Sequence, residues 1–140
     1  MAARKKKAAA PRHRLLIVDD EESVRLLLAR HASRGLKADV QLAGTCEQAL
    51  RFARNYAYDA ILLDLMMPGI GGFEVLKAIR ASSANMATPI LIISALEDMA
   101  TNDRCLAAGA SGFLVKPVEQ RALEIAVKSL LAARGKAKRT

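Results

Sequence analysis

Long apolar runs are missing from this chain. Its 140 residues contain no uninterrupted apolar stretch of the roughly 18 residues that a membrane-spanning helix requires, so no such helix is expected. The basic residues at positions 4–7 are not followed by a useful apolar stretch before the first predicted strand, which argues against a secretory signal. A transit peptide would have to end within about 14 residues, which is short. We therefore expect a cytoplasmic protein.

Cysteine is scarce as well. Cys46 and Cys105 stand far apart and without the spacing of metal ligands. This pattern indicates two reduced thiols on different helices rather than a disulfide framework or a zinc site. Neither cysteine ends a predicted strand, so we assign no chemistry to them.

Acidic residues are absent from both ends of the chain. Residues 1–14 hold six lysines and arginines and residues 134–140 hold four, while residues 15–133 carry 12 basic and 14 acidic residues, a net charge of −2. We predict disordered basic tails at 1–13 and 134–140 around one domain at 14–133. The tails have no aromatic residue for stacking, so nucleic acid is not the expected partner and any binding of it should be weak and salt-sensitive.

Short apolar runs alternate with longer amphipathic segments. The spacing predicts strands at 15–20, 38–42, 60–64, 89–94 and 112–116. It predicts helices at 21–34, from 45 onward, and at 73–81, 98–108 and 119–134, with Gly35 just past the end of the first. Five such units predict an α/β fold, a doubly wound parallel sheet with helices on both faces.

Polar residues close four of these strands: Asp19 and Asp20 the first, Asp64 the third, Ser94 the fourth and Lys116 the fifth. In a parallel sheet such ends lie on one edge, where these folds bind ligands. Each residue alone has a simpler role, since Asp20 could cap a helix, Ser94 could be an ordinary loop residue and Lys116 a solvated charge. Their joint placement favours a site.

Three carboxylates at one edge would repel one another unless a cation lies between them. Mg²⁺ prefers such oxygen ligands together with phosphate oxygens. Lys116 and Ser94 could contact a phosphoryl group, and Asp64 is then the natural nucleophile, because a carboxylate can form an aspartyl phosphate.

Four segments of the sequence resemble the receiver domains of two-component response regulators. They are Leu-Ile-Val-Asp-Asp-Glu-Glu at 16–22, Asp-Leu-Met-Met-Pro-Gly at 64–69, Ile-Ile-Ser-Ala at 92–95 and Phe-Leu-Val-Lys-Pro at 113–117. The intervals between them match too, and the resemblance covers 14–133. It implies a flavodoxin-like five-stranded sheet in the strand order 2-1-3-4-5.

The resemblance also implies roles for individual residues. The phosphoacceptor is Asp64, and Mg²⁺ is bound by Asp19, Asp20, Asp64 and the backbone carbonyl of Met66. The phosphoryl contacts and the switch come from Ser94, the backbone N–H of Ala95, Lys116 and Phe113, and the Lys116–Pro117 bond is cis. Phe113 has no hydroxyl, so switching would depend on burial of its ring.

The expected function is that of a single-domain response regulator. It would take a phosphoryl group from a phosphohistidine on a sensor kinase or a histidine phosphotransfer protein, and signal by protein contact or phosphorelay. It would not be an enzyme beyond catalysing its own phosphorylation and dephosphorylation. We expect no output domain after the last predicted helix.

Two other classes fit the sequence less well. A phosphohydrolase of the haloacid-dehalogenase type has a second aspartate two residues after its nucleophile, where this chain has Met66. A flavodoxin-like nucleotide binder would have a Ser/Thr/Gly loop after the first strand, whereas residues 19–22 are all acidic and repel phosphate unless a metal is bound.

Overall fold

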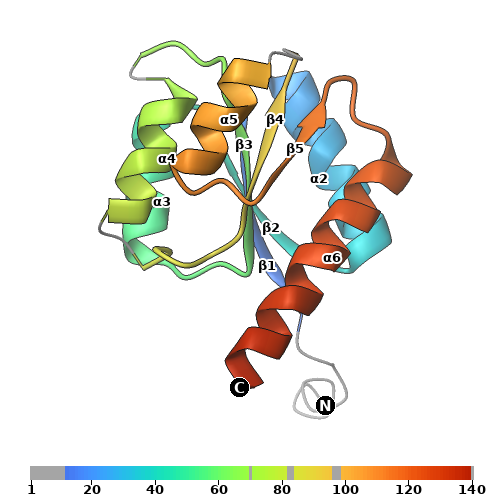
Figure 1. Cartoon of the computed structure of the whole chain (residues 1–140). Helices are drawn as coiled ribbons and strands as arrows, with labels where there is room; N and C mark the ends of the chain where they lie inside the picture. The colour runs from blue at the N-terminus through green and yellow to red at the C-terminus, as the bar shows by residue number, and fades with distance from the viewer. Residues whose placement is uncertain (1–11, 70, 82–83, 96–98, 140) are drawn as a thin grey trace.

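Five short apolar runs form the parallel strands of one sheet in this computed structural model, which describes residues 12–69, 71–81, 84–95 and 99–139. The strands follow the order β2-β1-β3-β4-β5, which confirms the predicted fold (Figure 1). The central strands β3 and β4 are buried along their whole length, as is typical of parallel strands covered on both faces. The strands are β1 (Arg14–Val18), β2 (Asp39–Ala43), β3 (Ala60–Asp64), β4 (Ile90–Ser94) and β5 (Gly112–Val115).

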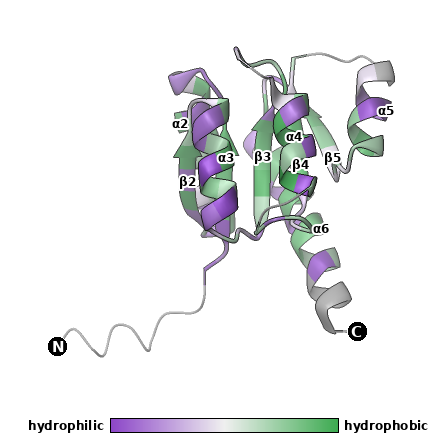
Figure 2. Ribbon diagram, turned by 90° about the vertical axis from the view of Figure 1, so that its left-hand side faces the viewer, coloured by the Kyte–Doolittle hydropathy of each residue, from purple (hydrophilic) through white to green (hydrophobic). Residues whose placement is uncertain are grey.

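Helices cover both faces of the sheet. One face packs against α2 (Glu22–Leu36) and α6 (Gln120–Arg139) through Leu28, Leu123 and Val127. The other packs against α3 (Cys46–Asn55), α4 (Gly72–Ala81) and α5 (Met99–Ala107). Figure 2 shows the strands as a hydrophobic layer between helices that carry hydrophilic residues, so the sheet is the centre of the core.

The first helix is longer than predicted and is capped differently. It continues through Gly35 to Leu36, and Lys37 takes the left-handed conformation that ends it, with φ of 51°. Tertiary packing explains the extension, because Leu36 is buried in the core and the Glu124 side chain of α6 occupies the space where Gly35 has no Cβ. At the start, Glu21 is the N-cap and makes no side-chain cap bond, so the cap predicted at Asp20 was wrong.

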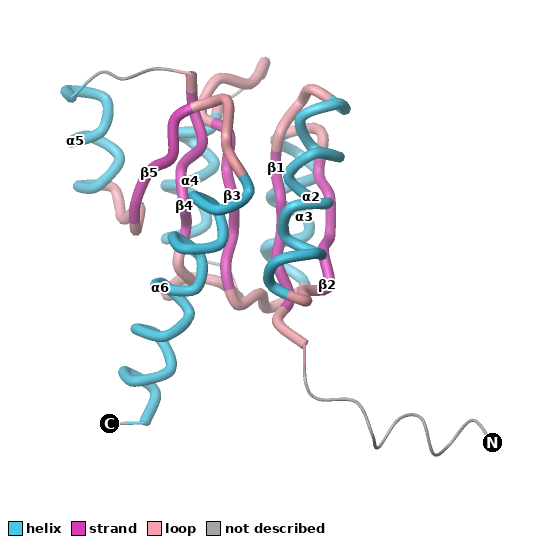
Figure 3. Tube along the Cα trace, turned by 90° about the vertical axis from the view of Figure 1, so that its right-hand side faces the viewer, coloured by secondary structure: helices cyan, strands magenta, loops and turns pink. Residues whose placement is uncertain are grey.

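The last helix is also longer than predicted. Positions 134–139, expected as a disordered tail, continue α6 to Arg139. The segment contains alanine, lysine and arginine, which favour helix, and only one glycine, whose cost is about 1 kcal/mol. Figures 1 and 3 show this end of α6 extending past the sheet, on the side where β1 begins.

The other predicted bounds lie within two residues of the observed ones, and those of β3 agree with them. Thr45 caps α3 as expected, since its hydroxyl accepts the N–H of Gln48 at 3.1 Å. Two expectations lie outside the described residues: the start of the fourth helix at Asp98, and the N-terminal tail apart from Arg12 and His13.

Candidate functional site

The polar strand ends lie together at the carboxyl edge of the sheet. Asp19 follows β1, Asp64 ends β3, Ser94 ends β4 and Lys116 follows β5. Asp19 and Asp64 are almost fully buried, at 0% and 3% exposed. A backbone hydrogen bond joins the ends of β4 and β5 at this edge, because the N–H of Lys116 donates to the carbonyl of Ser94 at 2.9 Å. The sheet therefore holds buried carboxylates at its ligand-binding edge.

The three carboxylates form one cluster with a single ammonium. Asp19, Asp20 and Asp64 each offer an oxygen, and these atoms lie within 4.8 Å of one another. Lys116 Nζ lies 3.0 Å from Asp19 Oδ2 and 3.4 Å from Asp64 Oδ2. Three negative charges thus face one positive charge in a largely buried place.

Backbone hydrogen bonds orient the two buried carboxylates. The N–H of Glu21 donates to Asp19 Oδ1 at 2.9 Å, and the N–H of Met66 donates to Asp64 Oδ1 at 3.1 Å. In each residue the other oxygen, Oδ2, is the one facing Lys116. Among the described residues, Asp19 Oδ2 is buried with no hydrogen-bond partner besides this ammonium contact.

The surroundings shift the pKa of two groups in the cluster. Burial and then the charge of Asp19 raise the pKa of Asp64, while the Met66 N–H and Lys116 oppose the shift. Burial acts to lower the pKa of Lys116, but its contacts with Asp19 and Asp64 outweigh this and the pKa is raised. The ammonium is therefore held charged, and the cluster retains an excess of negative charge that its own residues do not neutralise.

This donor set fits a hard divalent cation. All three side chains offer carboxylate oxygens, which Mg²⁺ prefers, and the buried Asp19 Oδ2 has Lys116 as its only close polar partner in the described part of the chain. Asp20 is exposed, so the cluster opens to solvent on its side. The residues present therefore suit an ion that keeps several waters and binds through a few carboxylates.

The other expected site residues take different positions. Ser94 is buried and Ala95 is exposed directly after it. Met66 is 61% exposed, and its backbone N–H contacts Asp64 Oδ1. Phe113 lies earlier on β5, half-buried against the core beneath α3, α4 and α5. The Lys116–Pro117 peptide bond is cis.

One residue beside the cluster was missed in the sequence. The Arg25 guanidinium donates to the backbone carbonyl of Asp19 at 2.8 Å. It passes Gly44, where an added Cβ would come within 2.8 Å of Nη1. Arg25 thus ties the first turns of α2 to the end of β1. The sequence carried no signal for this contact except a glycine after the second strand.

Gly72 should tolerate no side chain, because it packs against the backbone that follows Asp64. A Cβ there would collide with the Asp64 carbonyl and come within 2.6 Å of Leu65 Cα. We expect Gly72→Ala to lower the free energy of unfolding by about 1 to 3 kcal/mol, measured by urea denaturation. Gly112→Ala is the control, since its Cβ would meet only Leu91 Cδ1, at 3.4 Å. Equal stability of the two variants would contradict this packing.

No helix in the part of the chain that the structure describes is long and apolar enough to cross a membrane.

Residues 15–128 match the family described as response regulator receiver domain. The transcriptional regulatory protein CiaR of Streptococcus pneumoniae is 37% identical over 99 residues, which are 71% of this chain and 43% of CiaR. The chain thus spans less than half the length of this curated relative.

Two solved structures share the fold over nearly their whole length. The chemotaxis protein CheY4 of Vibrio cholerae is 30% identical, with a TM-score of 0.81, over 86% of this chain and 99% of that one. The receiver domain of the sensor histidine kinase PA1611 from Pseudomonas aeruginosa PAO1 has magnesium coordinated in its active site cleft. It is 27% identical with a TM-score of 0.79, over 87% of this chain and 99% of that one. Fold, strand-end residues and sequence agree, and the chain belongs to the response regulator receiver domain family.

Proposed function

We propose that this receiver domain takes a phosphoryl group onto Asp64 from a phosphohistidine of a histidine kinase or phosphotransfer protein. The observation that carries the proposal is the position of the Asp64 carboxylate, at the end of the central strand and 3.4 Å from Lys116 Nζ, within the acidic cluster. The phosphorylated domain passes the signal on by contact with another protein or by a further phosphorelay step. We propose 14–133 as the functional unit.

The chemistry follows from how Asp64 is held. Its Oδ1 accepts the Met66 N–H, so Oδ2 is the oxygen that can attack. An electron pair of Oδ2 forms a bond to phosphorus, and the bond from phosphorus to the donor imidazole nitrogen breaks with its electron pair remaining on nitrogen. Once the Asp64 carboxylate is phosphorylated, Lys116 holds a phosphoryl oxygen while keeping its contact with Asp19.

Other groups at the edge complete the phosphoryl site in this proposal. The Ser94 hydroxyl and the backbone N–H of Ala95 donate to phosphoryl oxygens. Because transfer of this kind depends on positioning and charge neutralisation more than on a base, no general base is required. Movement of Ser94 toward the phosphoryl group gives the half-buried Phe113 ring room to move inward, which transmits the change to β5.

Asp19, Asp20, Asp64 and the backbone carbonyl of Met66 are the groups we propose to hold Mg²⁺. The bound ion would neutralise charge on the phosphoryl oxygens during transfer. The excess negative charge of the cluster supports this assignment, as does the magnesium in the receiver domain of PA1611. The domain would catalyse only its own phosphorylation and the later attack of water on the acyl phosphate.

Labelling with a small phosphodonor tests the proposed function. The protein is incubated with radiolabelled acetyl phosphate and Mg²⁺, and the labelled peptide is identified after digestion. We expect one label per chain, on the peptide that contains Asp64, and a large loss of label when a chelator is added. A label located on a different peptide would refute the proposal.

Metal binding should depend on Asp20, although its side chain is exposed. Asp20 contributes one of the three carboxylates, and the domain offers few other oxygen ligands. We expect weak Mg²⁺ binding to the wild type, a higher melting temperature with the ion, and loss of both in Asp20→Ala. The control is Glu47→Ala, an exposed carboxylate on α3 outside the cluster. Unchanged affinity in Asp20→Ala would remove this residue from the site.

A further inference from the structure

Two of the three carboxylates in the cluster lie on one short turn. Asp19 and Asp20 connect the end of β1 to the start of α2. Asp19 Oδ1 accepts the Glu21 N–H at 2.9 Å, so the side chain of Asp19 closes this turn, and Asp20 between them is exposed. The placement of the two carboxylates relative to each other therefore depends on the conformation of residues 19–21.

Ordinary helix capping does little to hold this turn. Glu21 is the N-cap of α2, and its side chain makes no cap bond to the helix backbone. A side-chain bond at that position commonly fixes the entry of the chain into a helix. The start of α2 therefore depends on other contacts.

Arg25 supplies such a contact from one turn further along α2. Its Nη1 donates to the Asp19 carbonyl at 2.8 Å, and its backbone N–H donates to the Glu21 carbonyl at 3.0 Å. One residue thus bonds to both ends of the turn. From the other side, the Asp19 N–H donates to the carbonyl of Ala43, at the end of β2, at 3.1 Å. Both backbone polar groups of Asp19 are therefore held by neighbours.

The Arg25 guanidinium orients backbone and does not pair with a charge. Residues 19–22 are all acidic, yet Arg25 forms no ion pair with a carboxylate in the part of the chain that the structure describes. Arg25 is half-buried, and its guanidinium contacts the Asp19 carbonyl instead. A hydrogen bond from an ionised donor is stronger than one between neutral groups. The contact thus fixes the backbone of Asp19.

Gly44 leaves the space that this guanidinium occupies. A Cβ at Gly44 would come within 2.8 Å of Arg25 Nη1 and 3.2 Å of Arg25 Cζ. The backbone of Gly44 does not itself require glycine, because its φ lies outside the left-handed region. Its N–H donates to Gln48 Oε1 at 2.8 Å, a bond that an alanine can also make. Gly44→Ala therefore displaces the guanidinium without changing any charge.

We propose that Arg25 is a positioning residue for the metal site. Its hydrogen bond to the Asp19 carbonyl holds the turn in the conformation in which Asp19 and Asp20 bind Mg²⁺ together, and Gly44 keeps the path of the guanidinium open. The inference rests on the proposed Mg²⁺ site and adds a residue that is not a ligand. Groups that orient metal ligands change metal affinity about 10- to 100-fold when they are removed.

The charge and the position of Arg25 act on Mg²⁺ binding in opposite directions. A guanidinium beside a cation site repels the cation, so loss of the charge alone would tighten Mg²⁺ binding. Loss of the hydrogen bond to Asp19 lets the turn move, which weakens binding through the two carboxylates. The direction of the change in Arg25→Ala therefore separates the two effects.

The test titrates the metal-free protein with Mg²⁺ and follows the NMR shifts of the backbone amides. The variants are Arg25→Ala, Arg25→Lys, Gly44→Ala and the double variant Arg25→Ala with Gly44→Ala. Before the ion is added, the hydrogen-exchange rate of the Glu21 amide reports whether the turn is still closed on Asp19. Circular dichroism establishes that each variant is folded.

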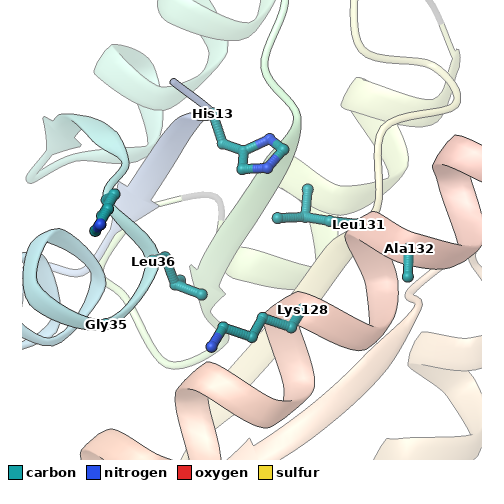
Figure 4. A pocket seen from close by; sticks show the side chains of 7 residues that line it. His13, Gly35, Leu36, Lys128, Leu131 and Ala132 are labelled. Carbon is teal, nitrogen blue, oxygen red and sulfur yellow. The ribbon is translucent and has the colours of Figure 1, made fainter. Parts of the chain in front are cut away.

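Two further variants control for charge and for the loss of a glycine. Figure 4 shows Lys128 on α6, beside a pocket of about 380 Å³ at the amino edge of the sheet, where the strands begin and opposite the cluster. Lys128→Ala removes one positive charge there and should bind Mg²⁺ within about twofold of the wild type. Gly112→Ala should do the same, since its Cβ would meet only Leu91 Cδ1, at 3.4 Å.

We expect Arg25→Ala to bind Mg²⁺ about tenfold more weakly and to exchange its Glu21 amide faster. Arg25→Lys should recover most of the affinity, because it keeps a charged donor. Gly44→Ala should resemble Arg25→Ala although it keeps the arginine. The double variant should bind no more weakly than Arg25→Ala, because the guanidinium that the new Cβ displaces is already absent.

Unchanged or tighter Mg²⁺ binding in Arg25→Ala would overturn the proposal and leave the metal site in place. Additive losses in the double variant would also overturn it, since Arg25 and Gly44 would then act separately. Should Arg25→Ala fail to fold, Gly44→Ala decides the outcome in its place. A wild type that binds no Mg²⁺ would refute the metal site itself and this inference with it.

Discussion

Asp64→Asn is expected to abolish labelling by acetyl phosphate while leaving the fold intact. The amide has the same shape as the carboxylate, and its oxygen can still accept the Met66 N–H that holds Asp64 Oδ1. It lacks the carboxylate electron pair that must attack phosphorus, so no acyl phosphate can form. The loss should be complete, because no other carboxylate lies at the end of the central strand.

Stability gives an independent check on the same variant. Burial and the charge of Asp19 raise the pKa of Asp64 in the folded protein. At neutral pH the ionised Asp64 carboxylate therefore destabilises the folded state relative to the unfolded one. Removing that charge should keep or raise the melting temperature in metal-free buffer. Asp39→Asn, an exposed carboxylate at the amino edge, should be labelled like the wild type. Undiminished label in Asp64→Asn would rule out this residue as the phosphoacceptor.

The sequence could predict which polar strand ends lie together because parallel sheets place strand ends on one edge. A polar residue after four apolar ones is a local signal, and both Asp19 and Asp64 follow such runs. The bounds of β3 agree with the prediction, and the acidic cluster with Lys116 forms as expected. The resemblance to receivers supplied the strand order and the cis bond before Pro117, which periodicity alone does not contain.

What the sequence did not reveal depends on contacts between distant residues. Gly35 is a common helix terminator, yet packing of Leu36 into the core and of Glu124 against Gly35 carries α2 past it. In the sequence, nothing distinguishes Arg25 from a surface arginine. In the structure, the absence of a side chain at Gly44 leaves room for the Arg25 guanidinium to reach the Asp19 carbonyl just after β1. Tertiary packing outweighs local propensity in both places.

Asn85 is another residue whose role only the structure reveals. It lies in the connection between α4 and β4, where a lone asparagine indicates no more than an ordinary turn. It is 0% exposed. Its Nδ2 donates to the carbonyls of Ala53 and Tyr56, both at 2.7 Å. Its Oδ1 accepts the N–H of Tyr58 at 2.8 Å and the hydroxyl of Thr88 at 3.0 Å. One side chain thus joins the end of α3 to the strands that follow.

Asn85→Ala is expected to lower the free energy of unfolding by about 3 to 5 kcal/mol. The reason is that the alanine leaves two carbonyls and the Tyr58 N–H without their partner, in a place that water does not reach freely. Each buried group left unpaired costs about 1 to 3 kcal/mol. Urea denaturation of the two proteins measures the difference.

The matched control for this prediction is Asn55→Ala, which removes the same side chain from an exposed position. Among the residues that the structure describes, Asn55 Nδ2 donates only to the carbonyl of Arg51, at 2.9 Å, at the end of α3 where solvent can replace it. Its loss should cost less than about 1 kcal/mol. If Asn85→Ala were no more destabilising than Asn55→Ala, the hydrogen bonds of Asn85 would be exchangeable with water. The turn before β4 would then be held by its other contacts. These are the Thr88 N–H that donates to the Asn85 carbonyl at 3.2 Å, and Arg80 Nη1, which donates to the carbonyls of Asn85 and Met86, both at 3.1 Å.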